Sequence, residues 1–99
     1  MPTPYAEHHQ HVSAIFRTLA APLRLAIVEL LVAHHRLHVH EIVALTGASQ
    51  PLASQHLRIL RQARLVDRVP AGHAVVYRLA QPEIASLLTA AARCTGDPT

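Results

Sequence analysis

A small, mainly α-helical domain that carries one β-hairpin is the fold class that this sequence predicts. Of its 99 residues, 51% are hydrophobic but only 3% are aromatic. Leu, Ile, Val and Ala must therefore form the core, and this composition favours helices over a β-sandwich. Five segments carry apolar residues at helical spacing, and two short β-branched segments flank a glycine-containing turn. A chain of this length is enough for one modest core, so residues 1–99 are expected to form a single domain.

Two helices are expected in the first third of the chain. Apolar residues recur at helical spacing over residues 8–20. Pro22 then opens a second helix that runs to about His34, because proline suits the first turn of a helix. The ends of the chain, residues 1–11 and 95–99, are expected to form a flexible histidine-rich arm and a flexible tail.

A helix-turn-helix unit is predicted in the middle of the chain. The segment 39–46 places its apolar residues on one side and stops at Gly47, which suits a left-handed helix cap. Ser49 is a candidate N-cap, and Pro51 lies in the first turn of a fourth helix that runs to about Ala63. Two short helices joined by a tight turn have the dimensions of a helix-turn-helix.

A β-hairpin follows this helix pair directly. Residues 65–69 and 74–79 are rich in β-branched side chains and flank a turn that contains Gly72. A hairpin in this position is a wing, so the predicted fold is a winged helix-turn-helix with five helices and a two-stranded wing. The fifth helix opens at Pro82 and ends before Gly96.

The two terminal helices are expected to make a homodimer. The last helix has an apolar stripe, and so small a domain offers little to bury it against. Pairing of the terminal helices with their copies in a second protomer would cover these stripes in a symmetric interface. The alternative is that both helices simply cap the monomer.

The solvent-facing side of the fourth helix is a candidate DNA-reading surface. Glutamine can address adenine edges, and arginine can address guanine or phosphate. No acidic residue occurs between positions 47 and 66, and the net charge is +3. An ordinary amphipathic surface helix is the alternative, but the hairpin downstream and the lack of acid favour double-stranded DNA as the partner. The candidate DNA-contacting residues are Ser49, Gln50, Ser54, Gln55 and Arg58, with Arg68 and His73 on the wing.

One segment resembles the ArsR/SmtB family of bacterial winged-helix regulators: HRLHVHEIVALTGASQPLASQHLRILRQARLVDRVPAGHAVVYRL. The likeness runs from about Leu19 to Leu87, and its most specific piece is the SQPLASQHLRIL run. It implies a homodimer that occupies operator DNA, usually as a repressor, and releases it when a metal ion or another signal binds. His56 lies in the family's reading helix and is therefore assigned to DNA contact or to packing.

Histidines form a candidate metal site. In many metal-sensing members of the family, a Cys-Val-Cys-Asp motif begins the helix before the turn, and the matching stretch here is HVHE at residues 38–41. Imidazole in place of thiolate favours zinc or nickel over softer ions. Four imidazoles would complete the coordination of a zinc ion. The alternative is that these histidines are solvated surface residues that bind no metal. The candidate ligands are His38 and His40, with His8, His9 and His11 of the arm.

A second, weaker metal site is suggested on the last helix by the same resemblance. The family pattern there is Asp-x-His followed by His-x-x-Glu or His, ligated across the dimer. The matching positions are Gln81-x-Glu83 and Cys94-x-x-Asp97. Gln81 is a poor ligand, so only Glu83, Cys94 and Asp97 remain as candidates. Cys94 is more often a small packing residue at such a position.

Catalysis and membrane association are not expected. His40 and Glu41 begin an HExxH-like pattern, but Ala44 occupies the position of the second metal ligand. The longest apolar stretch, residues 23–33, is shorter than the roughly 20 residues that span a bilayer. The N-terminus lacks the pattern of a signal peptide, so a cytoplasmic location is expected. The controlling signal stays open between a metal ion and a partner protein or non-metal ligand.

Overall fold

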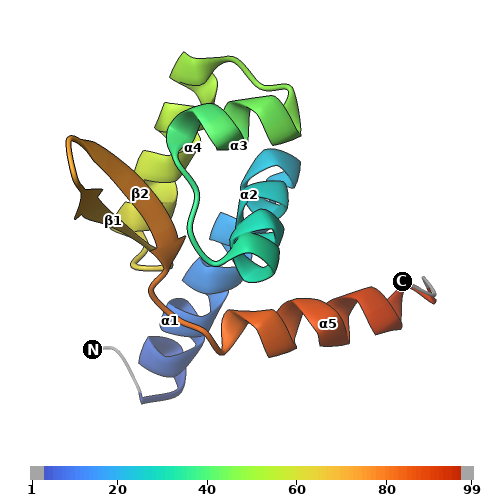
Figure 1. The fold of residues 1–99 in the computed structure, drawn as a ribbon. Coiled ribbons are helices and arrows are strands. Elements are labelled where there is room, and N and C mark those ends of the chain that lie inside the picture. The colour runs from blue at the N-terminus through green and yellow to red at the C-terminus, as the bar shows by residue number, and fades with distance from the viewer. Residues whose placement is uncertain (1–3, 97–99) are drawn as a thin grey trace.

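A computed structural model describes residues 4–96 of the chain. Its helices and strands are α1 (Pro4–Leu19), α2 (Pro22–His34), α3 (Val39–Thr46), α4 (Gln50–Gln62), β1 (Val66–Ala71), β2 (Ala74–Leu79) and α5 (Ile84–Cys94). In Figure 1, α3 and α4 lie together at one end, the hairpin lies beside α4, and α5 extends away from the body. The predicted fold of five helices and a two-stranded antiparallel wing is confirmed for the described residues.

The first helix begins earlier than the apolar pattern predicts. α1 starts at Pro4, so residues 4–11, expected to form an arm, are helical in the structure. Proline at the start needs no N–H partner, and Glu7 in the first turn interacts favourably with the helix dipole. The side chains of residues 7–11 are all exposed, so this part of the helix shows no apolar period. Residues 1–3 of the arm and 97–99 of the tail lie outside the described residues.

The predicted turn between α3 and α4 is confirmed in detail. Gly47 ends α3 with a φ of 75°, and its N–H donates to the carbonyl oxygen of Val43 at 2.9 Å. Ser49 caps α4, because its hydroxyl accepts from the N–H of Leu52 at 3.3 Å. Pro51 occupies the first turn of α4. These local contacts fix where α3 ends and where α4 begins.

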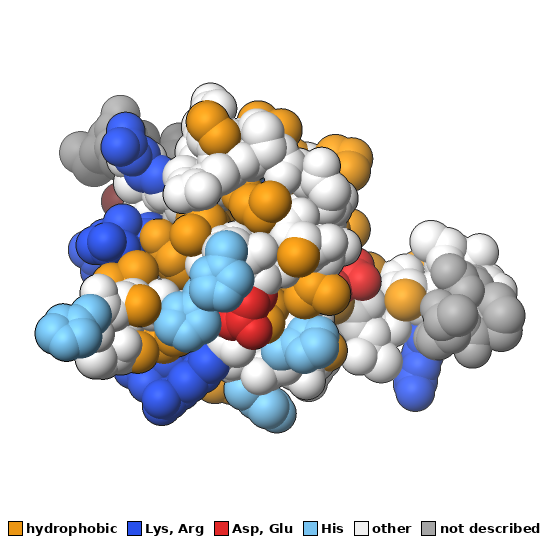
Figure 2. Space-filling view, turned by 45° about the horizontal axis from the view of Figure 1, so that its top comes forward, with side chains coloured by type: hydrophobic (Ala, Val, Ile, Leu, Met, Phe, Trp, Pro, Cys, Tyr) orange, Lys and Arg blue, Asp and Glu red, His pale blue; other side chains and the backbone are white. Residues whose placement is uncertain are grey.

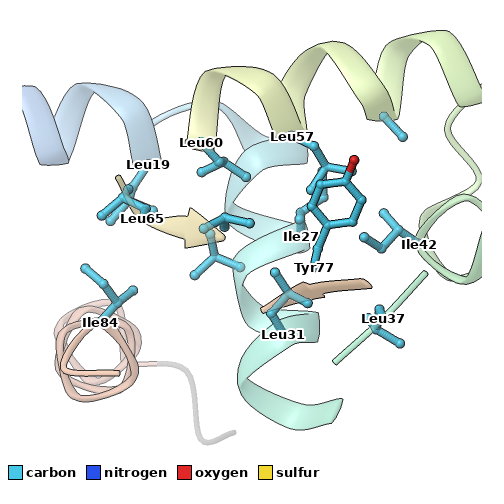
Figure 3. Packing of buried hydrophobic residues seen from close by; sticks show 13 residues of the cluster. Leu19, Ile27, Leu31, Leu37, Ile42, Leu57, Leu60, Leu65, Tyr77 and Ile84 are labelled. Atoms are coloured by element: carbon cyan, nitrogen blue, oxygen red, sulfur yellow. The ribbon is translucent and has the colours of Figure 1, made fainter. Parts of the chain in front are cut away.

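The core is centred on α2, which packs against α3, α4 and β2. Ile27 of α2 is fully buried, and Leu57 and Leu60 of α4 and Tyr77 of β2 point toward this helix (Figure 3). The buried residues of α4 are Ala53, Leu57 and Leu60, at the i, i+4, i+7 spacing of one helical face. Burial of one leucine contributes about 1.5–3 kcal/mol. The opposite face of α4 is thereby held toward solvent.

The wing is joined to the helices by its two strands and by one short backbone bridge. Val66 pairs with Leu79 at the base of the hairpin, and Gly72 forms its turn with a φ of 65°. Leu37, in the connection before α3, bridges to Tyr77 through two backbone hydrogen bonds of 2.8 and 3.1 Å. The start of α3 and the wing are therefore connected directly.

Apolar side chains on the terminal helices remain partly uncovered in a single chain. α5 contacts α2 and buries Ile84 in the core, whereas Leu87 and Leu88 are only partly buried. On α1, Val12 and Phe16 are 38% and 53% exposed. No polar or charged side chain among the described residues is buried, so the polar sites lie at the surface. None of the described helices is both long and apolar enough to cross a membrane.

Truncation of Leu57, which is 1% exposed, tests the packing of α4. Leu57→Ala should lower the free energy of unfolding by about 2–5 kcal/mol, because it removes buried surface and leaves a cavity. Leu52→Ala on the same helix removes a side chain that is 42% exposed and should change it by about 0.5 kcal/mol or less. Urea denaturation at one fixed protein concentration measures both. Equal losses would contradict this packing.

Candidate nucleic-acid interface

The exposed polar side chains of α4 are called here the reading face. None of its residues is acidic, and all of them lie outside the buried set Ala53, Leu57 and Leu60. Amide, hydroxyl and guanidinium groups donate and accept hydrogen bonds of the kinds that base edges and phosphates offer. The reading face consists of Gln50, Ser54, Gln55, Arg58, Arg61 and Gln62, all exposed.

A basic groove lies beside the reading face, between α4 and β1. It encloses about 540 Å³ and is lined by Arg58, Arg61 and Arg68 together with one acidic residue, Asp67. Asp67 lies 3.9 Å from the guanidinium of Arg78, and this exposed ion pair is worth little. Three guanidinium groups around one open groove give it the chemistry to attract anions such as phosphate.

Arg61 and Gln62 were missed in the sequence, although the helical pattern contained the signal. Arg61 follows Arg58 by three positions, which puts both side chains on one side of α4. All nine basic residues of the chain are arginines. Arginine binds phosphate and guanine through two parallel hydrogen bonds, which lysine cannot do. On the face drawn in Figure 2, the arginine side chains, coloured blue, gather mostly on the side of the hairpin. Few acidic side chains, coloured red, are visible there.

The wing carries the two residues expected on it. Arg68 lies on β1 opposite Tyr77 and is exposed, with its side chain lining the basic groove. His73 follows Gly72 in the exposed hairpin turn. The structure therefore brings Arg68 together with Arg58 of α4, whereas His73 lies at the far end of the hairpin.

His56 is held differently from the rest of α4. It is half-buried, and its Nδ1 atom lies 3.2 Å from a guanidinium nitrogen of Arg24 in α2. The same arginine donates through Nε to the carbonyl oxygen of Thr18, near the end of α1, at 2.7 Å. Arg24 was not among the predicted site residues, because no local pattern links it to a residue 32 positions later.

His38 caps α3 and is bound to the wing. Its N–H donates to the carboxylate of Glu41 at 2.8 Å, as one half of a capping box. Its Nδ1 atom lies 2.9 Å from the carbonyl oxygen of Val75 on β2. A carbonyl oxygen only accepts, so Nδ1 carries the proton, and Nε2 of the neutral ring keeps a free lone pair. His40 stacks on this ring at a centroid distance of 5.3 Å.

The structure does not gather the predicted metal ligands within one chain. His8 and His9 contact each other edge to face on α1, and His11 is exposed on the same helix. Over residues 4–96, no group of three or more His, Cys, Asp or Glu side chains lies close enough to hold a metal ion. His38 and His40 remain the two adjacent candidates.

The second candidate metal site is divided between the two ends of α5. Glu83 is the N-cap residue and Cys94 the last residue of this 11-residue helix. At 1.5 Å per residue they are about 16 Å apart, too far for one ion within one chain. Asp97 lies outside the described residues.

The fold and the site together define a winged helix-turn-helix regulator, and comparisons with known proteins agree. The sequence profile described as "bacterial regulatory protein, arsR family" matches residues 21–68. The chain is 42% identical over 83 residues to the HTH-type transcriptional repressor SmtB of Mycobacterium tuberculosis, covering 84% of this chain and 61% of SmtB.

Solved structures give the same result. Rv0081 of M. tuberculosis superposes with a TM-score of 0.82 at 33% identity, covering 96% of this chain and 92% of Rv0081. The homodimeric winged helix-turn-helix DNA-binding domain Mb0332 of Mycobacterium bovis has a TM-score of 0.84 at 26% identity, covering 99% of this chain and 90% of that one. The chain belongs to the ArsR family, whose members matched here are transcriptional regulators and not enzymes.

Proposed function

We propose that this protein is a DNA-binding transcriptional repressor that acts as a homodimer in the cytoplasm. The observation that carries the proposal is the acid-free reading face of α4 beside a groove lined by three arginines. The relative SmtB is named a transcriptional repressor, which supports repression as the outcome of DNA binding. Because the chain spans 61% of the length of SmtB, its activity and partners are argued here from its own residues.

In this proposal α4 enters the major groove and the wing lies on the flanking backbone. Gln50, Ser54 and Gln55 stand in the first part of α4, the part that contacts base edges in helix-turn-helix proteins. The arginines of the basic groove bind phosphates and set the position of α4 on the duplex. Base contacts then provide specificity, and phosphate contacts provide most of the salt-dependent affinity.

Pairing of the terminal helices would produce the homodimer. The partly exposed Val12 and Phe16 of α1 and the half-buried Leu87 of α5 supply apolar surface for a symmetric interface. Two copies of α4 would then read two half-sites of a pseudo-palindromic operator, about 34–36 Å apart.

We further propose that zinc or nickel modulates operator binding through His38. Its Nδ1–H already donates to a backbone carbonyl, the arrangement that fixes a metal-ligating histidine and leaves Nε2 for the ion. His40 is adjacent, and His8, His9 or His11 of a second protomer would complete the ligand set. A metal bound at His38 would act on the wing through the hydrogen bond to Val75.

The alternative is that a partner protein or a non-metal ligand supplies the signal. The sequence changes at Gln81, Glu83 and Cys94 favour this alternative, since they weaken the family's second metal site. Both versions keep the same DNA-binding dimer.

Two substitutions on α4 separate phosphate binding from base reading. With a duplex that the wild type enriches from a random-sequence pool, Gln55→Ala should cost about 1–3 kcal/mol of binding free energy on that duplex alone. Arg61→Ala should weaken binding to enriched and unrelated duplexes alike. It should also reduce the slope of log affinity against log salt by about 0.9 per lost phosphate contact. Arg93→Ala on α5 is the charge-matched control, and an equal effect of it would contradict the proposal.

The metal proposal is tested by calorimetry with Zn(II) and Ni(II) on metal-free protein. His40→Ala, which leaves the α3 cap intact, and His38→Ala should each abolish tight binding, whereas His34→Ala at the end of α2 should not. Metal should change operator affinity about 5- to 150-fold in the wild type, the usual range of allosteric coupling. Weak binding that leaves operator affinity unchanged would refute the metal signal and favour the partner protein.

A further inference from the structure

A bridge of two hydrogen bonds joins three helices around Arg24. From α2, this side chain donates through Nε to the carbonyl oxygen of Thr18 in α1 at 2.7 Å, and Nη1 lies 3.2 Å from Nδ1 of His56 in α4. Both Arg24 and His56 are half-buried. The bridge therefore connects the last turn of α1, an expected dimer helix, to the middle of the helix that presents the reading face.

The chemistry of the two partners fixes the protonation state of His56. A guanidinium has donors only, so Nδ1 of His56 must accept. The imidazole is then neutral and carries its proton on Nε2. Within the described residues, Nε2 makes no hydrogen bond. Arg24 thus leaves His56 with one free donor, in a fixed tautomer.

His56 lies on the flank of α4, not on its reading face. It follows Gln55 by one position, which turns it about 100° away around the helix, toward α2. Residues at the flank of a recognition helix face the DNA backbone more than the base edges, and backbone contacts position the protein. A phosphate oxygen only accepts, which matches the single donor that His56 offers.

We propose that Arg24 is a positioning residue for DNA binding: it holds His56 as the Nε2–H tautomer so that this ring donates to a backbone phosphate. Arg24 also fixes the flank of α4 relative to the end of α1. This inference rests on the proposed DNA-binding function and assigns one contact within it. It names a residue outside the helix-turn-helix as a determinant of affinity.

The tautomer can be measured without DNA. In the wild type, nitrogen-15 NMR of the histidine rings should show Nδ1 of His56 unprotonated and Nε2 protonated. In Arg24→Gln the two tautomers should mix, since glutamine can donate or accept. A protonated Nδ1 on His56 in the wild type would overturn the proposal whether or not the protein binds DNA.

Affinity for the enriched duplex tests the consequence. Arg24→Gln and His56→Ala should each lower it about tenfold, the loss of one hydrogen bond to a charged acceptor. The double variant should be no weaker than either single one, because both act through the same donor. Unrelated duplexes should lose affinity by the same factor, since a phosphate contact carries no sequence information.

Controls separate this proposal from a folding defect and from failure of the proposed function. Affinities are compared between variants whose urea-denaturation midpoints match that of the wild type. Arg24→Lys is a milder change that keeps the charge and N–H donors, and it should retain part of the affinity that Arg24→Gln loses. Arg93→Gln removes the same charge from α5 and should leave affinity unchanged. Additive losses, or a loss in Arg24→Gln without one in His56→Ala, would overturn the phosphate contact. A wild type that enriches no duplex would refute the function itself.

Discussion

Burial of one face of α4 against α2 is the constraint on which the rest of the structure depends. Because Ala53, Leu57 and Leu60 are inserted into the core around Ile27, α4 cannot turn about its own axis without losing their burial. Each of these contacts is worth up to a few kcal/mol, a large part of the net stability of a small domain. The polar face of α4 is therefore held in one orientation, beside the arginines that line the basic groove.

Two histidines show how surroundings decide what one side chain can do. His38 faces the carbonyl oxygen of Val75, so its Nδ1 is a donor, and in the neutral ring its Nε2 is an acceptor suited to a metal ion. His56 faces the guanidinium of Arg24, so its Nδ1 is an acceptor and its Nε2 a donor suited to phosphate. Each ring is connected to a second element, His38 to the wing and His56 to α2. A ligand at either ring would therefore affect more than one part of the proposed DNA-binding surface.

Most of the fold was predictable because it is encoded locally. Gly47 and Ser49 mark the turn by their own backbone and side-chain chemistry, and the spacing of Leu57 and Leu60 marks the face of α4. The start of α1 was not predictable from the apolar pattern, since its first turns are exposed. The links from Arg24 to His56 and from His38 to β2 join distant positions, and only packing of the whole chain brings them together.

The most direct test is to follow the backbone amides of the isotope-labelled protein by NMR while the enriched duplex is added. The largest changes are expected at the start and along the exposed face of α4, residues 49–62, and on the wing, residues 66–74. Small changes are expected along α5, residues 84–94. Changes concentrated on α5, or an absence of changes on α4, would contradict the claim that the exposed face of α4 is the surface that reads DNA.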